Sequence, residues 1–143
     1  MNKYELTNET KEFAGTTLYR IKALRDFRDV REGELGGWVG GYKNLSQEGY
    51  CWVYEHAYVS GNAKVFGNAE VSGDAWVFGD AKVSGNAEVY GDARVHGSAR
   101  IYGDARVSGN AWVYGTFKAH GNVRVRGSVD LREGELTEGI IHG

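Results

Sequence analysis

The sequence predicts an all-β protein whose main part is a parallel β-helix, or β-solenoid, of hexapeptide repeats. Three columns of residues that recur every six positions predict this fold. An apolar column, nearly all valine, spans residues 59–131, and an alanine column two positions ahead of it spans residues 57–111. Glycine forms the third column over residues 61–127, and Asn, Asp, Ser or Thr always follows it.

Residues 1–50 do not repeat, and we expect them to form a small β-rich N-terminal cap. The segments KYELTNE (3–9) and TTLYRIKAL (16–24) alternate as two strands, with Thr-Asn-Glu and Phe-Ala-Gly as breaks. An open β-helix would expose the backbone groups of its first coil, so solenoids need atypical ends. The first fifty residues therefore predict a cap for the repeats that follow.

Residues 51–131 are expected to form the solenoid itself. Residues two apart in an extended segment point to the same side, so the alanine and valine of each hexad face inward together. Glycine reaches positive φ without strain, and Asn and Asp tolerate the left-handed region, which predicts a sharp corner after each short strand. A period of six fits neither a helix of 3.6 residues per turn nor a hairpin sheet.

Two coil sizes are compatible with the hexads, and we expect three hexads per coil, as in proteins with similar repeats. A coil of three hexads would stack outward side chains along separate faces: Tyr58, Trp76, Arg94 and Trp112 on one, and Lys64, Lys82, Arg100 and Lys118 on another. A coil of two hexads would instead stack five aromatic residues into one ladder: Phe66, Phe78, Tyr90, Tyr102 and Tyr114.

The C-terminal residues 132–143 are expected to form a smaller cap or tail. The hexad pattern stops there, and DLREGEL (130–136) nearly repeats DVREGEL (29–35) of the N-terminal segment. The chain of 143 residues fits one domain, since a hydrophobic content of 41% supplies a single core.

Composition narrows the environment and the partners. One cysteine, Cys51, excludes an intrachain disulfide framework and suits a reducing compartment. The N-terminus has no apolar signal region, and no apolar run approaches the ~18 residues that span a bilayer. A net charge of −2 argues against bulk attraction to nucleic acid or anionic membranes. We expect a cytoplasmic protein without a membrane partner and without bulk attraction to nucleic acid.

The N-terminal half also carries specific motifs. The segments DFRDV (26–30), GGWV (36–39) and NLSQEGYCWVY (44–54), followed by GNAxVxG hexads, resemble the YdcK-like β-solenoid family over nearly the whole chain. The resemblance implies a single-stranded left-handed β-helix, related in shape to hexapeptide acyltransferases. Small members of this kind look like phage or prophage proteins, so the cytoplasm would be that of the bacterial host. No activity comes with the family, and no catalytic residue can be transferred.

An acyltransferase is the alternative that the solenoid shape raises. Such enzymes generally use a histidine base in a cleft between subunits, often with a loop extruded from the coil. Here the repeat has no insertion between Gly61 and Gly127, and His96 and His120 occupy outward positions that elsewhere hold Ser or Tyr. Neither zinc-ligand spacing nor a calcium-binding repeat is present, so we expect no metal, no cofactor and no catalytic residue.

Exposed aromatic residues form the candidate binding surface. Apolar patches rich in Trp, Tyr and Arg are typical of protein interfaces. We therefore expect a non-enzymatic interaction protein whose rigid solenoid binds another protein, such as a host or defence component, or forms a homodimer or homotrimer. A nucleic-acid, nucleotide or glycan binder along the aromatic face is a further alternative. The candidate binding residues are Trp76, Trp112, Phe66, Phe78, Tyr90, Tyr102, Tyr114, Arg94 and Arg100.

Overall fold

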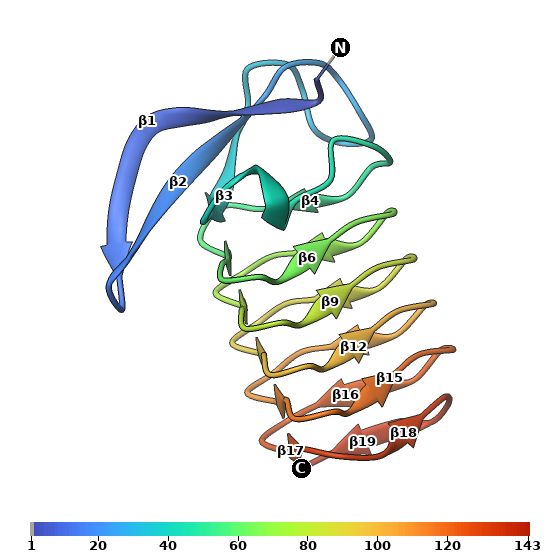
Figure 1. Ribbon diagram of the computed structural model, residues 1–143. Helices are drawn as coiled ribbons and strands as arrows, with labels where there is room; N and C mark the ends of the chain where they lie inside the picture. Colours follow the sequence, from blue (N-terminus) through green and yellow to red (C-terminus); the bar gives the residue numbers. More distant parts are fainter. Residues whose placement is uncertain (1) are drawn as a thin grey trace.

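The computed structural model describes residues 2–143 and shows a rod of stacked coils beneath an N-terminal cap (Figure 1). The fold is all-β and forms a parallel β-solenoid, as the hexads predict. Within the described residues, the strands form three sheets, which run along the rod as faces A, B and C.

Each hexad of the solenoid forms one short strand. On face A these are β5 (Tyr58–Val59), β8 (Trp76–Val77), β11 (Arg94–Val95), β14 (Trp112–Val113) and β17 (Asp130–Leu131). On face B they are β6 (Lys64–Val65), β9 (Lys82–Val83), β12 (Arg100–Ile101), β15 (Lys118–Ala119) and β18 (Glu135–Leu136). On face C they are β4 (Trp52–Val53), β7 (Glu70–Val71), β10 (Glu88–Val89), β13 (Arg106–Val107), β16 (Arg124–Arg126) and β19 (Ile140–His142).

The strand register confirms three hexads per coil. Val59 pairs with Val77 on face A and Val65 with Val83 on face B, so one coil takes 18 residues. The alanine column, and the valine column from Val59 to Val125, are buried and form the core. The single ladder of five aromatic residues that a 12-residue coil would give is therefore absent from the described residues, because its members are divided among three corners of the rod.

The corners explain the glycine column. Gly85 has a φ of 64°, and a Cβ atom there would lie 2.8 Å from the backbone nitrogen of Gly103 in the next coil. Both the backbone conformation and the close approach of successive coils therefore require glycine. At some corners the residue after the glycine adds a side-chain hydrogen bond along the rod, as where Asn86 donates through Nδ2 to Oδ1 of Asp104 over 3.2 Å.

The N-terminal segment folds into a long hairpin that descends beside face A (Figure 1). Strands β1 (Tyr4–Phe13) and β2 (Thr16–Ala23) pair antiparallel, and the turn at Ala14 and Gly15 has φ values of 51° and 78°. The predicted break at Phe-Ala-Gly is thus confirmed, with Ala14 and Gly15 as the turn and Phe13 as the last residue of β1. Thr-Asn-Glu is wrong as a break, because β1 continues through it with a register shift between Leu6 and Thr10.

Parallel pairing begins upstream of the regular hexads. Strand β3 (Leu35–Val39) pairs antiparallel with β2 and parallel with β5, and the short 3-10 helix η1 (Tyr42–Asn44) follows it. Leu45 forms a parallel bridge to Val65. The buried Asn44 replaces missing strand contacts by donating through Nδ2 to the carbonyl oxygen of Ala63 over 2.8 Å. Residues 35–53 therefore form an irregular first coil.

The cap closes the top of the core with large side chains. Phe27 and Tyr4 pack edge-on against Trp52, with ring centroids 5.2 Å and 6.1 Å away. Lys3 is fully buried beside them and donates through Nζ to the carbonyl oxygen of Cys51 over 2.7 Å. The cost of burying this amine lowers the pKa of Lys3.

The last coil continues the sheets through residues 130–142. Strands β17, β18 and β19 pair in parallel with β14, β15 and β16. Leu131, Leu136 and Ile141 are only partly buried against the core. No helix in the described part of the chain is long and apolar enough to cross a membrane.

A candidate interaction surface

Face A carries a ladder of large outward side chains. Tyr58, Trp76, Arg94 and Trp112 stand in register on successive coils, as the three-hexad coil predicts. The rings of Tyr58 and Trp76 stack with centroids 5.8 Å apart, and the Arg94 guanidinium lies 3.9 Å from the centre of the Trp76 ring. Such a cation–π contact fixes the ladder without an ion pair.

The hairpin covers the upper part of this ladder. Phe13 at the hairpin end packs on Trp76 with ring centroids 4.5 Å apart and on Tyr58 at 5.3 Å. Lys11 places its Nζ 4.3 Å from the centre of the Trp38 ring. Trp76 is consequently half-buried, whereas Trp112, below the reach of these contacts, is 46% exposed.

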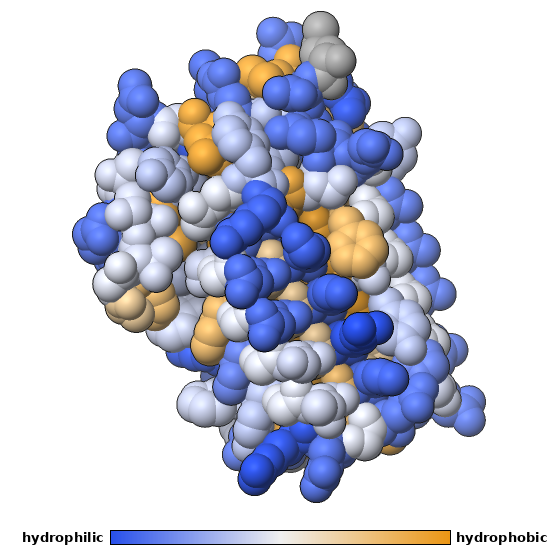
Figure 2. Space-filling view, viewed as in Figure 1, coloured by the Kyte–Doolittle hydropathy of each residue, from blue (hydrophilic) through white to orange (hydrophobic). Residues whose placement is uncertain are grey.

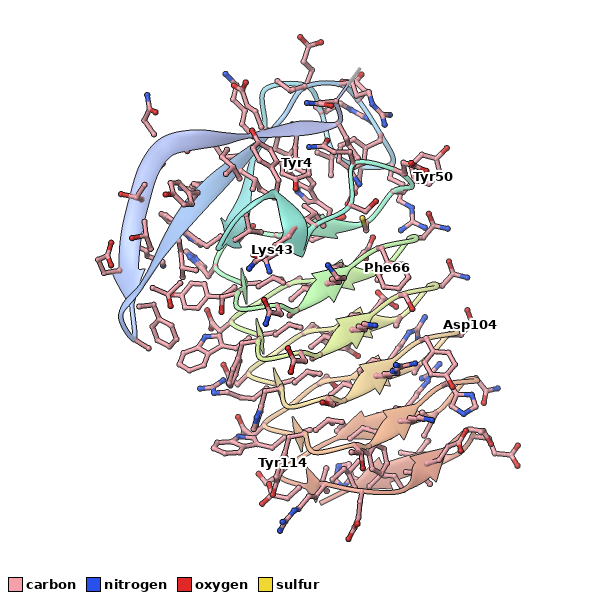
Figure 3. The ribbon with its side chains drawn as sticks, in the orientation of Figure 1. Tyr4, Lys43, Tyr50, Phe66, Asp104 and Tyr114 are labelled. Carbon is pink, nitrogen blue, oxygen red and sulfur yellow. The ribbon has the colours of Figure 1, made fainter. Side chains whose placement is uncertain are left out.

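A second aromatic stack lies on the corner between faces A and B, where Figure 3 labels Tyr114. His96 is sandwiched between Phe78 and Tyr114, with ring centroids 4.7 Å and 4.9 Å away and interplanar angles of 4° and 3°. Burial between the two rings lowers the pKa of His96. His96 also meets the edge of Trp112, at 6.1 Å, which joins the two stacks.

The two stacks and the hairpin end form one surface, which we call the aromatic face: Phe13, Trp76, Phe78, Arg94, His96, Trp112 and Tyr114. An apolar pocket of about 410 Å³ lies between the hairpin end and the solenoid, lined by Phe13, Trp76 and Phe78 among others. Sequence reasoning missed Phe13 and His96. The expected coil of three hexads could have placed His96 beside Phe78, but nothing in the sequence signals where the hairpin docks.

The other predicted binding residues lie elsewhere on the rod. Arg100 stands in the outward column of face B, and Phe66 and Tyr102 lie on the corner between faces B and C. Tyr90 lies on the corner between faces C and A. The nine predicted residues therefore make three separate surfaces.

Face C is polar and largely self-neutralised. Arg106 donates through Nε to Glu88 over 2.8 Å, and Arg28 of the cap pairs with Glu70 over 2.9 Å. The hydroxyl of Tyr54 donates to Asp29 over 3.0 Å, and burial together with the charge of Glu70 raises the pKa of this phenol. The two ion pairs, Arg106–Glu88 and Arg28–Glu70, line a polar pocket of about 300 Å³.

One histidine–carboxylate pair lies near the lower end. His120 contacts Glu135 through Nε2 and stacks on Tyr102 with ring centroids 4.5 Å apart. Within residues 2–143, no three His, Cys, Asp or Glu side chains converge closely enough to hold a metal ion.

A hexapeptide-repeat β-solenoid with aromatic outward stacks is thus the class that fold and surface define. The family model for the YdcK β-solenoid repeat matches residues 81–97 and 99–115. A curated relative, the uncharacterized acetyltransferase YdcK of Escherichia coli (strain K12), is 39% identical over 77 residues, which cover 43% of this chain and 24% of the relative. The alignment thus spans about a quarter of the relative's length. The matched part of the chain is thus similar to the YdcK β-solenoid repeat.

Proposed function

We propose that this solenoid is a non-enzymatic interaction module that binds a protein through the aromatic face. The observation that carries the proposal is the exposure of Trp112 beside the Phe78–His96–Tyr114 stack and the pocket next to Phe13. Exposed Trp, Tyr and Arg side chains grouped on a rigid scaffold are typical of interaction hot spots.

The direction of the rings favours a protein over a sugar or a nucleobase on this surface. The ring faces of Phe78, His96 and Tyr114 contact one another at 4.7 Å and 4.9 Å, so their edges point outward. Sugars and bases stack on ring faces. Trp76 is likewise engaged by Arg94 and Phe13. Ring edges and an apolar pocket suit the irregular side chains of a protein partner, which includes a second copy of this chain.

The test compares two exposed aromatic positions. Trp112→Ala removes the centre of the aromatic face, while Tyr90→Ala removes a ring that is 39% exposed on another corner. We expect Trp112→Ala to abolish capture of a defined partner from bacterial extract, or self-association in sedimentation at tens of micromolar. Loss of a hot-spot Trp costs about 2 kcal/mol or more. Equal binding by wild type and Trp112→Ala, for both partner and self-association, would contradict the proposal.

An acyltransferase remains the second candidate, because the His120–Glu135 pair could orient a general base and the curated relative is named an acetyltransferase. In this reading, turnover of an acyl-coenzyme A donor depends on His120. We expect no turnover, and His120→Gln should leave partner capture unchanged. Turnover that is lost in His120→Gln would replace the interaction module with the enzyme.

A further inference from the structure

Face B carries a column of four cationic side chains on successive coils. Lys64, Lys82, Arg100 and Lys118 stand directly in register. None of the four takes part in an ion pair within residues 2–143. Two acidic side chains lie nearest to the column. Asp80 is two residues before Lys82 in the sequence, and Glu135 is in register with Lys118 on the next strand but contacts His120. Like charges in register destabilise a sheet, so the column calls for an explanation.

The column suits a ligand with phosphates in series. Coils stacked at ~4.8 Å place the four cations over roughly 14 Å. Figure 2 shows the resulting strip of hydrophilic side chains over β6, β9 and β12, with apolar side chains beside it. The net charge of −2 is the sum over the whole molecule, whereas this strip concentrates positive charge on one face.

Aromatic side chains border the column on the corner between faces B and C. Phe66, Ser84 and Tyr102 occupy the same position on three successive coils, and Phe66 is 40% exposed. Above Phe66, a pocket of about 310 Å³ is lined by Tyr42, Lys43 and Lys64 among others. Figure 3 labels Lys43 and Phe66 on either side of β6 at the top of this face.

The corner between faces A and B shows what the position of Ser84 can hold. There, the ring of His96 lies between Phe78 and Tyr114, which are two coils apart, in nearly parallel contact with both. Phe66 and Tyr102 are also two coils apart, but the residue between them is the small Ser84. The same rod geometry therefore leaves room between Phe66 and Tyr102 for a planar ring supplied by a ligand.

We propose that face B binds a nucleotide unit, with its base between the rings of Phe66 and Tyr102 above Ser84 and its phosphates on the column of Lys64, Lys82 and Arg100. Cations that follow the backbone, together with rings that stack bases, are the two elements of single-strand recognition. A free nucleotide and single-stranded nucleic acid share this chemistry. The length of the column favours several phosphates in series.

A similar arrangement of rings, beside charges that neutralise one another, lies on the corner between faces C and A. Tyr54 and Tyr90 lie there two coils apart with Ser72 between them. The neighbouring carboxylates Glu70 and Glu88 form ion pairs with Arg28 and Arg106, so the charges beside this corner are neutralised and do not form a column of free cations for phosphate. This corner supplies a matched control for ring filling that leaves the charge unchanged.

The first test fills each position with a ring. Ser84→Phe should complete the stack on the B–C corner and block the base, while Ser72→Phe does the same where no nucleotide is expected. Fluorescein-labelled dT12 is the probe, followed by anisotropy at 50 mM salt. We expect Ser84→Phe to weaken binding about tenfold, the typical loss of one stacked base, and Ser72→Phe to leave it unchanged. Equal affinity in the two variants would overturn the base site.

The second test reverses charge. Lys82→Glu with Arg100→Glu should weaken binding of dT12 at least tenfold. It should also flatten the salt dependence, because the slope of log K against log salt concentration is about −0.7 for each phosphate contacted on a single strand. The control pair Arg124→Glu with Arg126→Glu makes the same change on face C, where both side chains are exposed. Equal loss in both pairs would mean non-specific attraction and overturn the proposal.

Competing ligands identify the source of the nucleotide. We expect dT12 to compete more strongly than ATP, which supports single-stranded nucleic acid. Stronger competition by ATP that is sensitive to Ser84→Phe supports a free nucleotide at the same site. Equal competition by a polyglutamate peptide, or no binding of dT12 or ATP to the wild type, overturns the proposal.

Discussion

At the scale of single residues, His96 is the side chain whose surroundings change its chemistry most on the aromatic face. Parallel rings cover both of its faces, and the resulting burial lowers its pKa below the ordinary value of 6.5. A neutral imidazole packs in the stack like another aromatic ring. A protonated imidazolium loses hydration there, so the stack and the surface built on it weaken in acid.

The replacement His96→Phe should therefore remove part of the acid sensitivity of the fold. Between pH 6.5 and the lowered pKa, the unfolded chain binds more protons at His96 than the folded chain. Stability from the neutral imidazole is thus present above pH 6.5 and is lost as the pH falls through the folded pKa. Urea unfolding at pH 7.5 and pH 5 should show a smaller difference for His96→Phe than for wild type.

The exposed His56 provides the control for this measurement. His56→Gln should keep the wild-type difference between the two pH values, because no aromatic stack covers that side chain. A His96→Phe protein with the full wild-type pH difference would show that the imidazole is not responsible.

At the scale of elements, the sequence predicts those parts whose cause is local. Each Ala-x-Val hexad carries its inward face, and each glycine carries its corner, so the short strands follow from the spacing. The spacing leaves two coil sizes open, and the strand register shows the coil of three hexads. The position of the hairpin depends instead on Phe13 meeting Tyr58 and Trp76, residues distant in sequence. No periodicity encodes that contact, so the half-burial of Trp76 could not be predicted.

The candidate site divides in the same way. The column of Lys64, Lys82 and Arg100 follows directly from the coil size, and the register bears it out. The aromatic face does not follow, because it combines two corners of the solenoid with the cap. The role of Ser84 as a gap between two rings is inferred only by comparison with His96, which fills the same position on another corner, since the sequence does not say how closely two rings stack.

Face B predicts an opposition between stability and binding. Lys82→Glu would place a carboxylate between Lys64 and Arg100, converting two like-charged neighbours into attractive pairs. Each opposite-charge pair contributes about 0.2–1 kcal/mol, so we expect a rise of a few degrees in the unfolding temperature. The same change should weaken dT12 binding.

Calorimetry and anisotropy on Lys82→Glu and Lys82→Gln together make this test. The glutamine variant only removes repulsion, so its unfolding temperature should lie between the other two. A Lys82→Glu protein that is less stable than wild type would contradict the account of the column as a site where binding opposes stability.

At the scale of the whole molecule, the two ends of the rod differ. The top is closed by Tyr4, Phe27 and Trp52, and the buried Lys3 fastens the N-terminal strand to Cys51. The last coil instead leaves Leu131 and its neighbours partly buried. Coils of a solenoid contact only their neighbours, so stability depends on where along the rod a contact is lost.

Replacing an inward residue by Asp should therefore unfold the whole protein in the middle of the rod but disturb only the last coil at the lower end. Val83→Asp buries a carboxylate on β9, which is fully enclosed between β6 and β12. Such burial costs several kcal/mol, comparable with the whole stability of a small domain, so folding should fail. Leu131→Asp places the carboxylate on a half-exposed edge strand, where only the last coil should fray.

Circular dichroism should report loss of the β-spectrum for Val83→Asp alone. Hydrogen exchange on Leu131→Asp should show fast amides confined to residues 130–142. A folded Val83→Asp protein would mean that the valine column tolerates charge, and global unfolding of Leu131→Asp would mean that the coils do not act as separable units.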